Sequence, residues 1–238
     1  MRIAKFLLAI FALLPALAAA QHATSALHED WDKLLRKHVN TDGVVSYEKF
    51  KADKALLDAY LVKLQKNAPQ SNWSREDKIA YWINLYNAFT IQIVLEKYPV
   101  ASIMDIDGGK VWQTRKINVG GQDYSLDAIE KTVLIKDLQE VRVHFAVNCA
   151  AASCPPLLNA AYTPKELESQ LDDRTRSFIN NSRYNKISAI ALEVSQIFQW
   201  YAADFGDVKA FIAKYSITKL PMFGGIKYKT YDWKLNGK

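Results

Sequence analysis

The sequence predicts a single α+β domain in which helices pack around a small, mostly antiparallel sheet. Helical periodicity dominates the first hundred residues, whereas short segments rich in β-branched residues gather in the second half. No strand–helix–strand unit repeats along the chain, which argues against a parallel α/β sheet. With 238 residues, the chain is long enough to bury one sizeable core.

Two amphipathic helices are expected at the start of the domain. Residues 25–38 carry leucines and Trp31 on one face and charged residues on the other. A turn at 40–43 separates this segment from a second helix over 46–65. The turn-rich segment 67–74 is expected to connect this helix to the next one.

A long buried helix is expected over 74–97. Its first residues, SRED, are typical of a capping box, and Pro99 follows its end. The middle of the helix, AYWINLYNAFTIQIVL, is apolar on nearly every face, which predicts burial on several sides. Asn84 and Asn87 lie inside this run. Because a buried amide without a hydrogen bond costs about 1–3 kcal/mol, each is expected either to hold a neighbouring segment or to act in a site.

The second half is expected to alternate short strands and short helices. The paired glycines in INVGGQDY favour a two-residue hairpin loop, because glycine adopts the positive φ angles that such loops need. The other expected elements are a short helix after Ser125, a buried strand over 141–148, a helix from Thr163 to 181, extended chain over 184–195, a helix over 196–215 and a strand over 226–233.

Residues 1–20 have the pattern of a secretory signal peptide. Arg2 and Lys5 precede an apolar run of about thirteen residues that ends in three alanines. This run is shorter than the roughly 20 residues needed to span a bilayer, so no stable membrane insertion is expected after cleavage. The predicted organisation is a leader over 1–20, an N-terminal helical segment over 21–66 packed on the core, and a main domain over 67–236. The predicted location is periplasmic or secreted.

The charge pattern limits the classes of partner that are expected for this protein. The net charge of +6 falls by two when a leader containing Arg2 and Lys5 is removed, and the lysines form no run. Nucleic acid is therefore not an expected partner. The expected partner is a peptide-like small molecule or an envelope component, and no cofactor is expected. The sequence carries no signal for an oligomeric state.

The segment HFAVNCAAASCPPL, residues 144–157, holds both cysteines of the chain and one of its four histidines. On a regular strand, His144 and Cys149 would point to opposite faces and lie about 16 Å apart. Cys154 follows a loop of small residues, and the proline after it fixes the direction of its side chain.

Four motifs occur in order along the chain: YWINLYNAF (81–89), KINVGGQDYSLDAIE (116–130), VRVHFAVNCAAASCPPL (141–157) and YDWKLN (231–236). By these motifs the chain resembles the family known as domain of unknown function 547, over roughly residues 70–236. The resemblance implies a set of pattern residues, all present here: Trp82, Asn84, Asn87, Arg142, His144, Cys149, Cys154 and the Pro155-Pro156 step. The chain departs from the pattern at Lys131, where the family often has a histidine. Members also occur in plants, apparently inside cells, and a cysteine pair shared with such members is harder to explain by a disulfide alone.

Three interpretations of the cysteine loop remain open. Four small residues between Cys149 and Cys154 allow a disulfide, which an oxidising compartment would favour. Alternatively, one thiolate attacks an acyl carbon, with His144 as base and Asn84 or Asn87 orienting the imidazole, as an amide does in papain-like enzymes. Metal binding is disfavoured because the loop has no matching second pair of ligands.

The first function hypothesis is a cysteine-dependent acyl-transfer or hydrolytic enzyme acting on a peptide-like substrate, by distant analogy with papain-like and transglutaminase-like folds. The predicted catalytic residues are His144, Cys149, Cys154, Asn87 and Asn84, and the predicted substrate-binding residues are Arg142, Trp82 and Tyr86. Other aromatic residues, Trp112, Tyr231 and Trp233 among them, are candidates for a ligand groove, although core packing is their default role. The second hypothesis is a non-catalytic peptide- or envelope-binding module with a Cys149–Cys154 disulfide clip. For Arg142, a surface or ion-pair role is an equal alternative to substrate binding.

Overall fold

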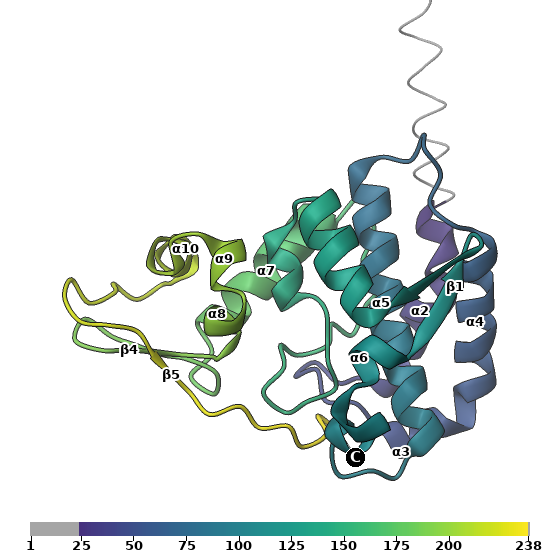
Figure 1. Cartoon of the computed structure of the whole chain (residues 1–238), viewed down its shortest axis with the longest axis horizontal. Coiled ribbons are helices and arrows are strands. Elements are labelled where there is room, and N and C mark those ends of the chain that lie inside the picture. The colour runs from purple at the N-terminus through teal and green to yellow at the C-terminus, as the bar shows by residue number, and fades with distance from the viewer. Residues whose placement is uncertain (1–23, 238) are drawn as a thin grey trace, which may run out of the picture.

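The computed structural model describes residues 24–237, and the predicted leader lies outside the described residues. The fold is a single α+β domain with two sides (Figure 1). One side holds the helices of the first half and a β-hairpin, and the other holds the later helices and a second small sheet. The predicted fold class is confirmed, but the strands form two separate small sheets instead of one.

Helix α5 (Arg75–Lys97) is the central element of the first side, as Figure 1 shows. Its predicted capping box is confirmed, because the Ser74 side chain accepts a hydrogen bond from the backbone of Asp77 and the Asp77 carboxylate binds back to Ser74. Most residues between Ile79 and Leu95 are buried, so this helix is covered on all sides, as its uniformly apolar sequence predicts.

The N-terminal helices cover α5. They are α2 (Glu29–His38), α3 (Tyr47–Phe50), the 3-10 helix η1 (Lys51–Asp53) and α4 (Lys54–Lys66). The buried stripe of α4 packs on α5, and α2 packs on α4. The second predicted helix is thus nearly continuous, with one tighter turn in its middle.

Short elements follow α5: the 3-10 helices η2 (Ile103–Asp105) and η3 (Asp107–Gly109), α6 (Val111–Thr114), and the strands β1 (Lys116–Val119) and β2 (Gln122–Ser125). The predicted hairpin is confirmed. Its loop is Gly120-Gly121, and both residues have positive φ angles, 59° and 89°.

The next two elements carry the candidate site. Residues Ala128–Asp137 form a π-helix, η4, and Val141–Phe145 form a 3-10 helix, η5. The predicted buried strand over 141–148 is therefore wrong. Most of the segment is buried, but among the described residues no strand lies beside it, and its backbone bonds close short turns such as Ala146 N–H to Val143 C=O at 2.9 Å.

The second side contains α7 (Leu167–Ile179), β3 (Lys186–Ile187), β4 (Leu192–Val194), α8 (Ile197–Trp200), α9 (Ala202–Phe205), α10 (Val208–Tyr215) and β5 (Lys227–Tyr228). Strand β4 pairs antiparallel with β3 and parallel with β5. Helix α7 begins at Leu167, a few residues later than predicted from Thr163, and the predicted late strand is confined to two residues.

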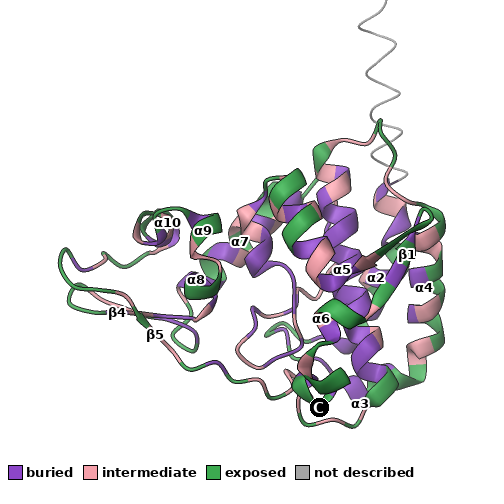
Figure 2. Ribbon diagram, in the orientation of Figure 1, coloured by how far each residue is buried: buried purple, intermediate pink, exposed green. Residues whose placement is uncertain are grey.

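Two buried hydrophobic clusters lie side by side, one around α5 and one around α7–α10 (Figure 2). The C-terminal segment runs back across them, with bridges from Lys234 to Ser102, from Leu235 to Ala151 and from Gly237 to Val45. It therefore ties both sides to the cysteine loop.

Within residues 24–237, no helix has the length and apolar composition that a membrane crossing requires.

Candidate functional site

A pocket opens where the two hydrophobic clusters meet, with about 680 Å³ of empty space including its mouth. Its lining comprises Tyr86, Trp112, Gln113, Asp127, Glu130, His144, Val147, Cys149, Cys154, Pro155, Ile197, Trp200, Tyr201, Tyr231 and Trp233. The structure thus brings four of the residues predicted from sequence to one pocket: His144, Cys149, Cys154 and Tyr86.

His144 projects from η5 and is 2% exposed. Its Nε2 lies 2.8 Å from Asp204 Oδ2, and because a carboxylate only accepts, Nε2 carries the proton and donates it. The imidazole stacks on Tyr201 with ring centroids 3.9 Å apart, and it also contacts the Phe205 ring, with centroids 5.4 Å apart. Both the position and the tilt of the ring are therefore fixed.

Glu130 lies on the π-helix η4 and is 5% exposed. Its Oε1 is 3.3 Å from His144 Nδ1, and its Oε2 accepts a hydrogen bond from the Tyr86 hydroxyl at 3.4 Å. The imidazole consequently lies between two carboxylates, those of Glu130 and Asp204. The wider turns of a π-helix are rare and are often found at functional sites.

Three phenols of the pocket keep their protons. Burial, and then the charge of Glu130, raise the pKa of Tyr86, Tyr201 and Tyr231 well above the ordinary value of a tyrosine. They are hydrogen-bond donors across the whole physiological pH range, and they cannot serve as bases there.

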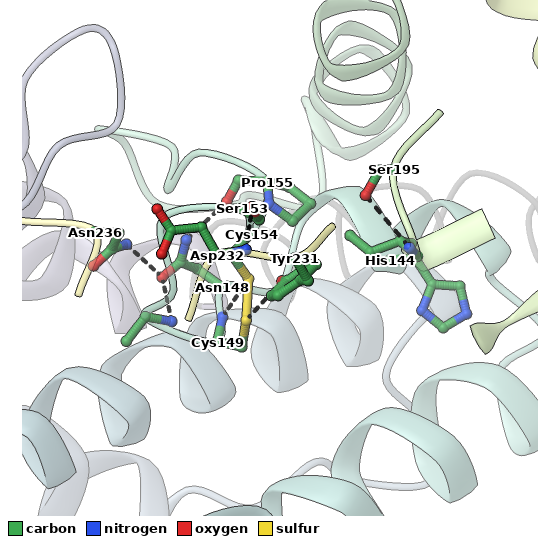
Figure 3. The surroundings of a disulfide bond; sticks show 12 residues. His144, Asn148, Cys149, Ser153, Cys154, Pro155, Ser195, Tyr231, Asp232 and Asn236 are labelled. Atoms are coloured by element: carbon green, nitrogen blue, oxygen red, sulfur yellow. Dashed lines mark hydrogen bonds between the residues drawn. A yellow bond between two sulfur atoms is a disulfide. The ribbon is translucent and has the colours of Figure 1, made fainter. Parts of the chain in front are cut away.

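Cys149 and Cys154 are joined by a disulfide with a Cα–Cα distance of 6.0 Å. The backbone N–H of Cys149 donates to Cys154 Sγ at 2.8 Å, and the Tyr231 hydroxyl lies 3.3 Å from Cys149 Sγ. Figure 3 shows Tyr231 beside the two sulfurs and the His144 ring apart from them. Within residues 24–237, no hydrogen bond joins His144 to either sulfur.

Asn148 organises the cysteine loop from inside. Its Nδ2 donates to the Pro155 carbonyl at 2.7 Å, and its Oδ1 accepts from the Ala150 N–H and from Asn236 Nδ2 (Figure 3). Because it is 2% exposed and uses both ends of its amide, Asn148 holds the two ends of the loop and the C-terminal segment in one arrangement.

Asn84 and Asn87 bind backbone, and neither lines the pocket. Asn87 donates to the Ala146 carbonyl at 3.0 Å and accepts from the Asn148 N–H at 2.8 Å. Asn84 makes the same pair of bonds to Tyr162, at 2.8 and 3.0 Å. Each amide therefore ties a loop to α5, and Asn87 ties the loop that leads to Cys149.

Arg142 and Trp82 lie away from the pocket. The Arg142 guanidinium binds the carboxylates of Glu140, Asp172 and Glu168 at 2.7–2.9 Å. It is an ion-pair residue between η5 and α7. Trp82 packs on Tyr124 of the hairpin, with ring centroids 4.8 Å apart.

One wall of the pocket is aromatic and continuous. Trp233 contacts Tyr231, Trp200 and Trp112, with ring centroids 4.6–5.8 Å apart. Trp200 is 46% exposed at the rim. The lining contains the carboxylates of Asp127 and Glu130 and no lysine or arginine. Lys131 lies nearby and pairs with Asp127 at 3.1 Å.

Sequence reasoning missed Glu130, Tyr201, Asp204 and Trp200. Glu130 had a detectable signal, because it lies four residues after Leu126 on the same expected inward face. Asp204 has none, since it reaches His144 across 60 residues of chain. Among residues 24–237, no group of three or more histidine, cysteine, aspartate or glutamate side chains is arranged to hold a metal ion.

Residues 70–179 match the model of the family described as "Protein of unknown function, DUF547". No curated protein and no solved structure matches the chain. The chain is therefore a DUF547 family member, identified by the segment that contains Glu130, His144 and both cysteines. The matched segment ends before Trp200, Tyr201, Tyr231 and Trp233, so the C-terminal part of the chain completes the pocket.

Proposed function

We propose that this DUF547 domain is a binding module whose pocket takes a peptide-like ligand by a positively charged group. The Glu130 carboxylate carries the proposal: it borders the pocket, and within residues 24–237 it pairs with no lysine or arginine. Its hydrogen-bond donors are phenols, and His144 Nδ1 lies 3.3 Å from it without a hydrogen bond. Because a buried carboxylate gains from an opposite charge, an ammonium or guanidinium group of the ligand supplies the missing partner.

The aromatic wall supports the same ligand. Cations bind to the faces of tryptophan and tyrosine rings, with tryptophan the strongest partner. Trp112, Trp200 and Trp233 all border the pocket beside the two acidic groups. Its cavity volume without the open mouth is about 180 Å³, below the roughly 300–1,000 Å³ of sites for drug-sized molecules, so the pocket suits the cationic end of one side chain.

The other hypothesis from sequence is a cysteine-dependent acyl-transfer or hydrolytic enzyme. That chemistry requires a free thiolate within about 3–4 Å of the imidazole. Here Cys149 and Cys154 are bonded to each other, and the nitrogens of His144 face Asp204 and Glu130. These contacts favour the binding module, with the disulfide forming part of the pocket wall.

We also propose that the protein acts in the periplasm or outside the cell. The leader pattern over residues 1–20 and the paired cysteines support this location, because disulfides persist in oxidising compartments. Fractionation of cells that produce the full chain, with N-terminal sequencing of the product, tests it. Recovery of the uncleaved chain in the cytoplasm would contradict it.

Two probes with acetylated α-amines and the same four-carbon side chain test the ligand class. The lysine amide carries a terminal ammonium group that the norleucine amide lacks, and the tryptophans of the pocket report binding by fluorescence. We expect lysine amide to bind at least tenfold more tightly than norleucine amide, which corresponds to about 1.4 kcal/mol. We expect Glu130→Gln to remove this preference, because the amide keeps the shape of the side chain but not its charge.

Glu48→Gln is the matched control. It makes the same change at an exposed position of α3, away from the pocket, and should leave the preference intact. Equal binding of the two probes, or equal loss of preference in both variants, would contradict the proposed function.

A further inference from the structure

The geometry points to a thiol-exchange site in the pocket wall, and this inference goes beyond ligand binding. We propose that a small thiol attacks Cys149 Sγ from the pocket, forms a mixed disulfide there, and releases Cys154 as the leaving thiolate. Three independent observations carry the proposal: the access to the two sulfurs, the bonds that hold their loop, and the donors that face them.

The two sulfurs differ in access. Both cysteines line the pocket, but Cys149 is partly exposed whereas Cys154 is 5% exposed. Thiol–disulfide exchange depends on which sulfur an incoming thiolate can reach. Cys149, the more exposed of the two residues, is therefore the proposed point of attack. Cys154 also borders a second cavity, beside Asn148 and Arg183. Attack on Cys154 Sγ from that cavity is the alternative that the experiment must distinguish.

The loop does not depend on the disulfide for its shape. Ala152 N–H donates to the Lys234 carbonyl at 2.7 Å, and Ser153 N–H donates to the Asp232 carbonyl at 3.1 Å. Asn148 ties the start of the loop to Pro155 from within. Because these bonds hold the loop to the C-terminal segment and close it between Asn148 and Pro155, opening the disulfide leaves the loop in position, so the bond can break and re-form in the folded protein.

The leaving sulfur already has a donor. The Cys149 N–H points at Cys154 Sγ from 2.8 Å, and a hydrogen bond to a charged acceptor is stronger than one to a neutral acceptor. This donor therefore favours Cys154 as a thiolate. The Tyr231 hydroxyl is 3.3 Å from Cys149 Sγ and keeps its proton because burial raises its pKa, so it can donate to the Cys149 thiolate that the second exchange step releases. Figure 3 shows Tyr231 beside the disulfide.

The exchange balances with two molecules of a small thiol as the reductant. The first thiolate forms a bond to Cys149 Sγ, the Cys149–Cys154 bond breaks, and its electron pair stays on Cys154 and takes up a proton. A second thiolate attacks the sulfur of the first at the mixed disulfide. The products are the dithiol protein and one oxidised thiol pair, and the protein disulfide has been reduced by two electrons.

Mass spectrometry locates the attacked sulfur. Folded protein is mixed with 2-mercaptoethanol, quenched in acid at intervals, alkylated with N-ethylmaleimide and digested. We expect the 2-mercaptoethanol adduct on Cys149 and the maleimide on Cys154. An adduct on Cys154 would overturn the proposed direction. Reduction that occurs only as fast as global unfolding, measured in parallel by circular dichroism, would overturn the proposal as a whole.

Two variants locate the attacked sulfur even if the mixed disulfide of the wild type is too short-lived to detect. Cys154→Ser and Cys149→Ser are each treated with cystamine, an oxidised thiol, after far-UV circular dichroism has established that they are folded. Cys154→Ser leaves the accessible sulfur and should form its adduct at least tenfold faster than Cys149→Ser. Equal rates, or the reverse order, would contradict the assignment of Cys149 as the attacked sulfur.

The charge of the thiol separates this proposal from the binding function. Rates with cysteamine, 2-mercaptoethanol and 3-mercaptopropionate are each divided by the rate of the same thiol with a small reference disulfide. If Glu130 attracts cations into the pocket, the normalised rate is highest for cysteamine and lowest for the carboxylate. Exchange at Cys149 without this order of rates would support the exchange site and contradict the proposal that the pocket binds a cationic ligand.

Discussion

Replacing Asn87 with alanine is expected to destabilise the fold and to alter the pocket. The substitution leaves the Ala146 carbonyl and the Asn148 N–H without partners in the interior, since Asn87 is 2% exposed. Each unmet buried group costs about 1–3 kcal/mol. The free energy of unfolding should therefore fall by about 2–6 kcal/mol, and we expect a value near 4.

Asn84 provides a matched comparison on the same helix. It makes the same two bonds to the backbone of Tyr162, and Asn84→Ala should cost as much stability. Tyr162 does not border the pocket, whereas Asn148 begins the cysteine loop. Asn87→Ala should therefore change lysine amide binding and the rate of disulfide exchange severalfold, and Asn84→Ala should leave both within twofold.

Urea unfolding, followed by tryptophan fluorescence and by far-UV circular dichroism, measures the stability of both variants. Binding and exchange are measured in the absence of urea, on samples that circular dichroism shows to be folded. A loss below 1 kcal/mol in both variants would refute the reasoning about unmet backbone groups. Equal effects of the two variants on the pocket would refute the positioning role of Asn87.

Two further predictions concern charge in the interior. Burial, and to a smaller extent the nearby charge of Lys63, lower the pKa of His28 to about 3 from its ordinary 6.5. Between these two pH values His28 is protonated in the unfolded chain but not in the folded protein. The free energy of unfolding should therefore fall as the pH drops from about 6.5 toward 3, by at most about 5 kcal/mol. Urea unfolding between pH 7 and 4.5 should show a smaller dependence on pH for His28→Gln than for the wild type. The same dependence in both proteins would contradict this. Arg142→Gln should lower the free energy of unfolding by about 2–4 kcal/mol, because the buried Glu140 carboxylate keeps only Arg75 and the backbone N–H of residue 142 as partners, while lysine amide binding stays within twofold. A tenfold loss of binding with stability unchanged would instead favour the substrate-contacting role first predicted for Arg142.

Elements with local signals were predictable from the sequence. The start of α5 depends on Ser74 and Asp77, which are three residues apart, and the hairpin loop depends on two adjacent glycines. In both cases the residues that specify the geometry lie within the element itself. The class of the fold follows from the same kind of local pattern.

The segment 141–148 was predicted as a strand because it is rich in apolar, β-branched residues. Such a composition indicates that a segment is buried, but not that its backbone pairs with another strand. Val143, Phe145 and Val147 are buried, as in a strand, yet the neighbours of the segment are helices, and within residues 24–237 no strand lies beside it. The backbone groups that a strand would pair are met by short turns and by the Asn87 amide, about 60 residues away in sequence. A polar partner this distant leaves no trace in the local pattern.

The pocket divides its roles between two parts of the chain. The segment that matches the family supplies Glu130, His144 and the disulfide, and the residues after it supply most of the aromatic wall. Changes in that wall would alter the shape of the accepted ligand without touching the carboxylate or the sulfurs. Trp233 couples the parts, since it contacts Trp112 of the first and Trp200 of the second, while its carbonyl accepts a hydrogen bond from Ser102. The C-terminal segment therefore fixes the distance between the Glu130 carboxylate and the aromatic wall. This distance determines which ligands can contact both.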